Sequence, residues 1–286
     1  MTKSPFEVVA PEQGRSCVVF ASPHSAREYP WALLQASVLD EHTIRSSEDA
    51  FVDTLFGAAP DYGAAFLKAG APRAFVDLNR SPDELDPALI EGVKRPGHNP
   101  RVASGLGVIP RVVANGRAIY NGKISRLEAQ RRLDTYWYPY HARLQALLDE
   151  AMRQTGQAVL IDCHSMPHEA VQNVTRTGGA RPDVVLGDRF GAAASAQIVD
   201  RVEAAFLSAG FAVARNAPFA GAYVTQAYGR PARGQHAVQV EIDRALYMDE
   251  VRIRPSDQFE EVRRALTGVI AEICQIGQAR MPLAAE

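Results

Sequence analysis

Two histidines follow short apolar runs that have the composition of buried strands. His24 comes shortly after residues 17–21, and His164 comes shortly after residues 158–161. The ends of parallel strands meet at one edge of a sheet, so these imidazoles could converge although they are far apart in the chain. A catalytic zinc uses three His or carboxylate ligands and keeps one position open for water. The pair therefore predicts two metal ligands; the alternative is a hydrogen-bonded turn residue in each case.

The third ligand of such a site should be an acid near the same edge. The Ser-Glu-Asp segment at residues 47–49 supplies two candidates, Glu48 and Asp49. The residues themselves leave both open.

A mid-strand carboxylate offers a general base. In the predicted strand at 236–243, residues 238–243 alternate strictly between apolar and polar, which places the two kinds of side chain on opposite faces of the strand. Glu241 lies in the middle of this run, and a carboxylate buried there must be paired, protonated or close to a metal. Such surroundings raise the pKa of a carboxyl group toward working pH. The alternative is the solvent-facing side of an edge strand.

Cys163, beside His164, invites comparison with a cysteine nucleophile. Neighbours on a strand point to opposite faces, so this thiol and imidazole cannot form a nucleophile–base pair. We therefore expect Cys163 to be a packing residue, and Asp162 to lie on the face of His164, near the metal. The chain contains no Gly-x-Ser-x-Gly elbow and no Gly-rich nucleotide motif after a strand. Metal-assisted hydrolysis is the chemistry that remains.

Two arginines at the ends of predicted strands are candidates to bind an anionic substrate. Arg80 and Arg244 could each grip a carboxylate with two parallel hydrogen bonds. The alternative is a surface ion pair, which we favour for Arg244. We expect His141 to be packed on a helix, and His42 and His168 to be loop residues.

These residues must be positioned by alternating strands and helices. Strands are predicted at residues 17–21, 64–67, 74–77, 158–161, 211–214 and 236–243. Helices are predicted at 32–40, 50–56, 126–153 (kinked or divided at Pro139), 192–208, and from 257 with a capping box completed by Glu260. The alternation predicts an α/β fold with a mostly parallel sheet covered by helices.

Residues 81–124 are rich in proline and glycine and show no regular period. A long irregular insertion in a compact domain is often a binding loop or lid, and otherwise a plain surface loop. Both interpretations stay open.

The composition of the chain argues against several classes of partner and of protein. The 286 residues are 47% hydrophobic and 22% charged, with a net charge of −2, so neither nucleic acid nor an anionic membrane is an expected partner. Three widely spaced cysteines argue against a disulfide framework, and no run of residues has the length and apolarity of a membrane span. The start of the chain lacks the apolar region of a signal peptide, and we expect a cytoplasmic protein.

Taken together, the motifs resemble those of the N-formylglutamate amidohydrolase family, over about residues 20–250. The matching segments are Ser-Pro-His-Ser at 22–25, Glu-Asp-Ala-Phe-Val-Asp-Thr-Leu-Phe at 48–56, Phe-Val-Asp-Leu-Asn-Arg at 75–80, Pro-Tyr-His at 139–141, Ile-Asp-Cys-His-Ser-Met at 161–166, Asn-Ala-Pro-Phe-Ala-Gly at 216–221 and Gln-Val-Glu-Ile-Asp-Arg at 239–244. Each segment is short, and their number and order make the match specific.

The resemblance implies a three-layer α/β/α sandwich similar to the zinc carboxypeptidases, with a mixed, largely parallel sheet in one domain over residues 1–286. It implies a Zn²⁺ ion held by an acidic residue between two histidines, with Glu241 as general base. The implied ligands are His24, Asp49 (with Glu48 second) and His164, and the predicted substrate contacts are Asn79, Arg80, Arg244 and Tyr228.

The implied reaction is hydrolysis of a small anionic N-acyl amino acid, foremost N-formyl-L-glutamate to glutamate and formate, as in histidine degradation. We expect a monomer or small homo-oligomer. The first motif departs from the family, because Ala26 and Arg27 stand where a glycine usually follows, and this leaves the substrate open. The alternatives are a deacylase for another N-acyl amino acid or small peptide, and a zinc-containing binding protein without turnover.

Overall fold

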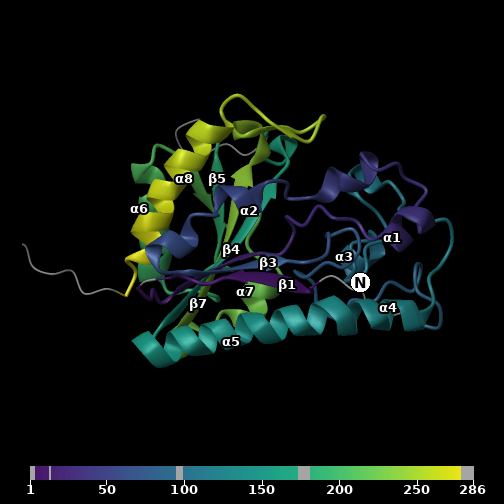
Figure 1. Ribbon diagram of the computed structural model, residues 1–286, viewed down its shortest axis with the longest axis horizontal. Helices are drawn as coiled ribbons and strands as arrows, with labels where there is room; N and C mark the ends of the chain where they lie inside the picture. The colour runs from purple at the N-terminus through teal and green to yellow at the C-terminus, as the bar shows by residue number, and fades with distance from the viewer. Residues whose placement is uncertain (1–3, 13, 95–98, 173–180, 278–286) are drawn as a thin grey trace, which may run out of the picture.

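The computed structural model describes residues 4–12, 14–94, 99–172 and 181–277, and its centre is a seven-stranded sheet (Figure 1). The strand order is β1-β3-β2-β4-β7-β5-β6. The strands are β1 (Phe6–Val9), β2 (Val18–Ser22), β3 (Ala65–Ala69), β4 (Ala158–Met166), β5 (Val184–Gly187), β6 (Val213–Arg215) and β7 (Gln235–Asp243). A separate hairpin pairs β8 (Met248–Asp249) with β9 (Arg254–Pro255).

The sheet is mixed and largely parallel. Strands β3, β2, β4 and β7 run parallel to one another, whereas β1 is antiparallel to β3 and β5 is antiparallel to β7. Strand β6 is parallel to β5. The predicted α/β class with a largely parallel sheet is therefore confirmed.

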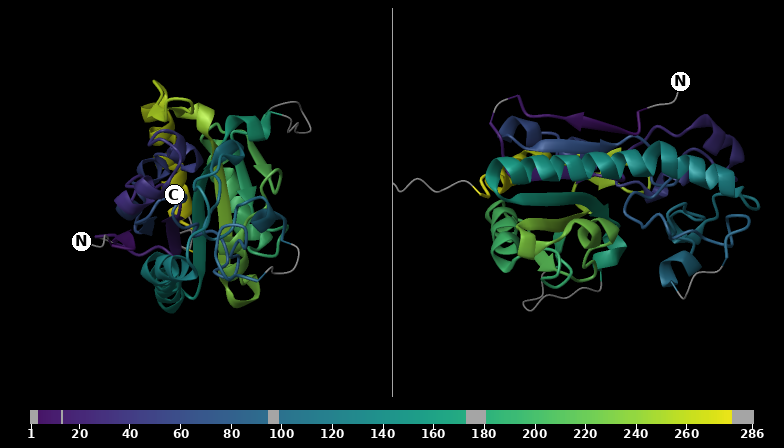
Figure 2. Two further views of the ribbon diagram at one scale, coloured as in Figure 1. Left: turned by 90° about the vertical axis from the view of Figure 1, so that its right-hand side faces the viewer. Right: turned by 90° about the horizontal axis from the view of Figure 1, so that it is seen from below.

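Helices cover both faces of the sheet and make three layers (Figures 1 and 2). One face carries α2 (Val52–Leu55), α6 (Ala196–Ser208) and α8 (Phe259–Cys274). The other carries α5 (Tyr138–Thr155) and α7 (Tyr223–Tyr228). Each face has its own apolar cluster, which accounts for the apolar stripe of each covering helix.

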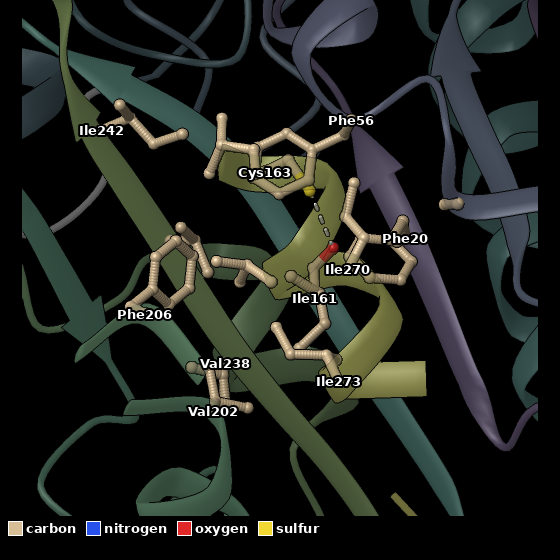
Figure 3. Packing of buried hydrophobic residues seen from close by; sticks show 14 of the residues in the cluster. Phe20, Phe56, Ile161, Cys163, Val202, Phe206, Val238, Ile242, Ile270 and Ile273 are labelled. Carbon is tan, nitrogen blue, oxygen red and sulfur yellow. Dashed lines mark hydrogen bonds between the residues drawn. The ribbon is translucent and has the colours of Figure 1, made fainter. Parts of the chain in front are cut away.

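One face of β4 is apolar, and the other carries the polar residues of the candidate site. Ile161 and Cys163 point into the cluster beneath α6 and α8, where Phe20 and Ile270 pack around them (Figure 3). The opposite face of the strand begins with apolar Ala158 and Leu160 and continues with Asp162 and His164. The prediction that Cys163 packs on the face away from His164 is confirmed.

Strand β4 extends further than its apolar run suggested. Pairing with β7 continues to Met166 and sets Asp162 beside Gln239 and His164 beside Glu241. Polar side chains persist on this buried face because they bind one another along each strand, Asp162 to His164 at 3.0 Å and Gln239 to Glu241 at 2.8 Å.

The long predicted helix is divided as expected at Pro139. It consists of α4 (Arg126–Arg132), a π-helical turn (Leu133–Trp137) and α5, whose first turn contains Pro139. Proline has no N–H to donate, and the wider π turn accommodates the missing bond.

The predicted strand at 74–77 is wrong. The backbone N–H of Phe75 donates to the carbonyl of Pro72 at 2.9 Å, which closes a turn, and Val76 reaches the apolar cluster beneath α5 without strand pairing. The helix predicted at 32–40 is the shorter α1 (Trp31–Ala36). The expected capping box is also wrong, since Gln258 caps α8 without a side-chain hydrogen bond.

The region 81–124 contains little regular structure. Its helices are α3 (Pro100–Ala103) and a 3₁₀ turn (Ala114–Gly116), and residues 95–98 lie outside the described part. The other 3₁₀ turns are Thr43–Ser47, Ala59–Tyr62, His168–Val171, Pro231–Arg233 and Arg244–Leu246. None of the helices in the described ranges has the length and apolarity needed to cross a membrane.

All three cysteines are free and buried, and we predict that they are unreactive in the folded protein. Burial raises the pKa of Cys17 to about 11 and of Cys274 to about 12, and that of Cys163 well above its ordinary value. The thiolate is the reactive form, so an aromatic disulfide reagent at pH 8 should label none of them until urea is added. Rapid labelling of Cys163 in the folded protein would contradict its assignment as a packing residue.

Candidate metal centre and its cavity

The two predicted histidine ligands meet at the ends of neighbouring parallel strands. His24 follows β2, His164 lies near the end of β4, and their ring centroids are 4.9 Å apart. Asp49 joins them because its backbone N–H donates to the carbonyl of His24 at 3.1 Å. Each residue offers one ligand atom within 4.8 Å of the others, and all three are buried. Such a group could hold a metal ion.

Asp49 is the centre of this group. Its Oδ2 lies 2.9 Å from Nδ1 of His164 and 3.4 Å from Nδ1 of His24. Its Oδ1 accepts a hydrogen bond from Nη2 of Arg244 at 3.0 Å. Glu48, the other candidate acid, is engaged elsewhere, since both of its oxygens accept from Arg45 at 2.9 and 3.1 Å. The structure therefore brings Asp49 to the histidines.

Two further aspartates each contact Nε2 of one of the two imidazoles. Asp77 Oδ1 lies 2.7 Å from Nε2 of His24, and Asp162 Oδ2 lies 3.0 Å from Nε2 of His164. An ionised carboxylate only accepts hydrogen bonds, so Nε2 of each ring donates to its aspartate, and Nδ1 of His164 donates to Asp49 until a cation replaces that proton. This carboxylate–histidine arrangement is how proteins orient histidine ligands and make them better electron donors.

A separate feature of these ligand atoms supports the binding of a cation. Nδ1 of His24 is buried and has no hydrogen-bond partner among the described residues. A buried unpaired nitrogen is costly, and a metal ion would use its lone pair. Two imidazole nitrogens and one carboxylate oxygen form an accepted ligand set for divalent zinc and related ions.

Asp49 and Asp77 remain ionised at neutral pH. Burial would raise the pKa of Asp49, but the hydrogen bonds and charges of His164 and His24 outweigh it and hold this pKa well below the ordinary value. For Asp77 burial is likewise outweighed, chiefly by His24 and Arg73, and its pKa is also low. Negative charge is thus concentrated where the ligand atoms converge.

Glu241 differs from the other acids. It lies on β7 opposite His164, is buried, and accepts a hydrogen bond from Nε2 of Gln239 at 2.8 Å. Burial, reinforced by the charge of Asp49, raises its pKa to about 7, while His164 acts in the opposite direction. β7 is an internal strand, so the alternative of a solvent-facing edge does not apply.

A cavity of about 570 Å³ opens over this group. Its floor includes His24, Asp49, His164 and Glu241, and one wall is the segment from Pro218 to Ala222. The irregular region supplies another part of the lining, which includes Arg101, Ser104, Leu106, Val112, Val113 and Asn115. Of the two interpretations left open for residues 81–124, the structure thus supports the one in which they face a binding site.

Asn79 and Arg80 lie on the wall of the cavity beside the metal group. Asn79 Oδ1 accepts from the backbone N–H of Val224 at 2.8 Å, and its Nδ2 lies 3.4 Å from Oδ2 of Asp162. Arg80 donates from Nε to the carbonyl of Leu106 at 3.0 Å and from Nη1 to that of Asn79 at 2.8 Å. Asn79 is therefore fixed by internal bonds, whereas Arg80 keeps N–H groups that these bonds do not use.

Helix α5 and the π turn before it fix this loop, a role the sequence did not reveal. Trp137 Nε1 donates to the carbonyl of Arg80 at 3.0 Å, and Nε2 of His141 lies 2.9 Å from the carbonyl of Leu78. Burial lowers the pKa of His141 to about 3, so this ring is neutral and donates from Nε2. His141 is packed on a helix, as predicted, and positions the Asn79-Arg80 loop.

The structure places two predicted substrate contacts differently from expectation. Arg244 is buried against Asp49 and Ser165 and lines the cavity, so the surface ion pair that we favoured is wrong. Tyr228 does not line the cavity; its hydroxyl lies 2.8 Å from Nδ1 of His141. Tyr228 therefore supports His141 instead of facing a ligand.

His42 and His168 lie outside the metal group. His42 contacts the carbonyl of Val251 at 2.8 Å, and His168 contacts Oδ2 of Asp243 at 2.7 Å. Among the residues that sequence reasoning missed, Asp77 and Gln239 are the most closely connected to the site. Both lie in segments that had been singled out, Phe-Val-Asp-Leu-Asn-Arg and the alternating strand, and this was the available signal.

Known proteins match this chain over nearly its whole length. N-formylglutamate deformylases of Pseudomonas putida and Pseudomonas aeruginosa are 28% and 29% identical over 276 residues, covering 94% of this chain and 95% of each relative. The crystal structure of an N-formylglutamate amidohydrolase from Ralstonia eutropha JMP134 matches with a TM-score of 0.88 at 34% identity, over 96% of this chain and 98% of the other. A gene product from Agrobacterium tumefaciens shares the fold with a TM-score of 0.63 at 15% identity, over 96% and 94%.

The family model described as N-formylglutamate amidohydrolase matches residues 16–248, which is most of the chain. The chain belongs to the N-formylglutamate amidohydrolase family.

Proposed function

We propose that this protein is a zinc-dependent deformylase that converts N-formyl-L-glutamate and water to L-glutamate and formate, a step of histidine degradation. The observation that carries the proposal is the buried group of His24, Asp49 and His164 at the base of a cavity, with Glu241 beside it. The names of the two Pseudomonas relatives support the choice of substrate.

The donor set supports zinc among divalent ions. Two histidines and one carboxylate leave a fourth tetrahedral position open, which distinguishes catalytic zinc sites from structural ones with four closed ligands. A zinc ion bound there would supply Lewis acidity to the reaction.

Glu241 has the location and acidity of the general base. A carboxyl group with a pKa of about 7 is substantially ionised at neutral pH and can hold a proton briefly. It would accept a proton from the attacking water on its carboxylate and return it to the amide nitrogen as the C–N bond breaks. The attacking water and the amide together then yield formate and a free amine.

Arg80 and Arg244 have separate tasks in this proposal. Arg80 lies next to Asn79 and would pair with a substrate carboxylate, which fixes the direction of the formyl group. Arg244 is bound to Asp49 and would chiefly hold this ligand in place. A screen of N-formyl, N-acetyl and dipeptide substrates separates the deformylase from other deacylases, and tight binding without turnover would indicate a binding protein.

The first test concerns the metal. Chelator-treated protein should bind one zinc ion in equilibrium dialysis, and His164→Ala should abolish this stoichiometric binding. Asp162→Asn removes the acceptor behind His164 and should weaken zinc affinity by about 10- to 100-fold. His42→Ala is the matched control and should bind like the wild type, since His42 lies outside the group. Equal affinity in all four proteins would refute the assigned ligands.

The second test concerns the base. Glu241→Gln preserves shape but cannot accept the proton, so formate release should fall by about 10²- to 10⁴-fold while zinc stays bound. Glu260→Gln, on the exposed face of α8, serves as control. Full activity of Glu241→Gln would rule out the proposed role.

The third test uses the stability of the zinc-free protein. Folding raises the pKa of Glu241 from about 4.5 to about 7, so the folded state holds the proton more tightly than the unfolded state. This contribution to stability is complete below pH 4.5 and is lost as the pH rises through 7. At pH 8 Glu241→Gln should therefore gain on the order of 1–3 kcal/mol relative to the wild type in urea unfolding, and little at pH 4.5. A difference that does not change with pH would show that this carboxyl group is not perturbed.

A further inference from the structure

Four arginines line the cavity, and only two of them have a carboxylate partner. Arg73 Nε lies 3.1 Å from Oδ2 of Asp77, and Arg244 Nη2 lies 3.0 Å from Oδ1 of Asp49. The other two, Arg80 and Arg101, form no ion pair within 4.0 Å of any carboxylate in the described part of the chain. The cavity therefore presents two arginines without an ion-pair partner.

Hydrogen bonds through Leu106 link Arg80 and Arg101 and show which of the two lies nearer to the metal group. Asn79 touches His164, with Nδ2 and Nε2 3.1 Å apart, and Arg80 follows it in the chain. Arg80 Nε donates to the carbonyl of Leu106, whose own N–H donates to the carbonyl of Arg101 at 2.8 Å. Arg80 is thus the nearer cation, and Arg101, which is exposed, is the outer one.

Arg101 is held on a fixed backbone. Asn99 caps α3, with Oδ1 accepting from the N–H of Arg101 at 3.0 Å. Arg111 ties the same helix to the rest of the region, with Nη2 3.3 Å from the carbonyl of Ala103 and Nε 2.8 Å from Oδ2 of Asp86. Only the side chain of Arg101 therefore has to adjust when a ligand enters.

The two cations repel each other. Burial, together with the charges of Arg73 and Arg101, lowers the pKa of Arg80, and the charge of Asp77 only partly opposes this. One carboxylate at Arg80 would leave Arg101 uncompensated, whereas a ligand with two carboxylates would neutralise both.

We propose that Arg101 binds the side-chain carboxylate of the substrate while Arg80 binds the α-carboxylate, so that the site selects N-acylated dicarboxylic amino acids. This assignment rests on the proposed function. It places the α-carboxylate, two bonds from the amide nitrogen, at the inner cation and the γ-carboxylate of a glutamyl group, two methylenes further away, at the outer one.

The test compares N-formyl-L-glutamate with N-formyl-L-glutamine, in which a neutral amide replaces the γ-carboxylate. The zinc-loaded wild type should prefer the glutamate derivative in kcat/KM. Arg101→Gln should reduce this preference by about 10- to 100-fold, the value of a hydrogen bond to a charged group, through a higher KM for the glutamate derivative. Arg117→Gln, also exposed in the irregular region but not lining the cavity, is the matched control and should keep the preference.

A preference unchanged in Arg101→Gln, or equal losses with both substrates, would overturn the assignment. If the wild type releases formate from neither substrate, the deformylase proposal fails and calorimetry tests Arg101 separately. The zinc-loaded protein should then bind glutarate more tightly than butyrate, and Arg101→Gln should lose that difference. Retention of the difference would overturn the role of Arg101 independently of any reaction.

Discussion

The carboxylate of Asp49, shared between two buried imidazoles and one buried guanidinium, is the interaction on which the rest of the site depends. Burying charged groups is costly unless each is paired. Here Asp77 and Asp162 pair with Nε2 of His24 and of His164, and Arg73 in turn binds Asp77. Nδ1 of His24, a buried ring nitrogen without a hydrogen-bond partner among the described residues, points to the need for a cation.

The fold supplies the rigidity that such a cluster requires. Strands β2, β4 and β7 lie side by side, so their side chains are set in register by backbone hydrogen bonds. The reverse face of β4 is anchored in an apolar cluster through Ile161 and Cys163 (Figure 3). On the other side, the π turn and α5 hold the Asn79-Arg80 loop through the carbonyls of Arg80 and Leu78, which leaves the remaining N–H groups of Arg80 for a ligand. His164 and Glu241 thus stand on paired strands, whereas His24 and Asp49 lie in connecting segments that the strands and the hydrogen bonds between these residues hold in place.

Much of this arrangement could be predicted because it follows from local pattern. Apolar runs ending in His24 and His164, and the alternation around Glu241, locate these residues on strands whose ends share one edge. The family resemblance was needed to prefer Asp49 over Glu48, because adjacent acids in a loop carry no orientation signal. The turn at Phe75 escaped prediction because its apolar side chains are buried by tertiary packing and not by a sheet. Strand β5 was missed because it is only four residues long, and its place depends on antiparallel pairing with β7.

The burial of Arg244 and the supporting roles of Trp137 and His141 could not be read from the sequence for a related reason. Each contact joins segments separated by dozens of positions, and a single sequence contains no record of such pairs. The same limit applies to Tyr228 on α7, because its partner is His141 on α5. Sequence patterns thus locate the functional residues at strand ends, but they do not show the side chains that hold these residues in position.

The most direct test of the account is the coordination of the ion, measured by anomalous diffraction at the zinc edge of zinc-loaded crystals. The structure predicts one ion bound by Nδ1 of His24, Nδ1 of His164 and a carboxylate oxygen of Asp49, at about 2.0–2.2 Å. Both Nε2 atoms should keep their bonds to Asp77 and Asp162. An ion bound through Nε2, or an anomalous peak away from these three residues, would contradict the central claim.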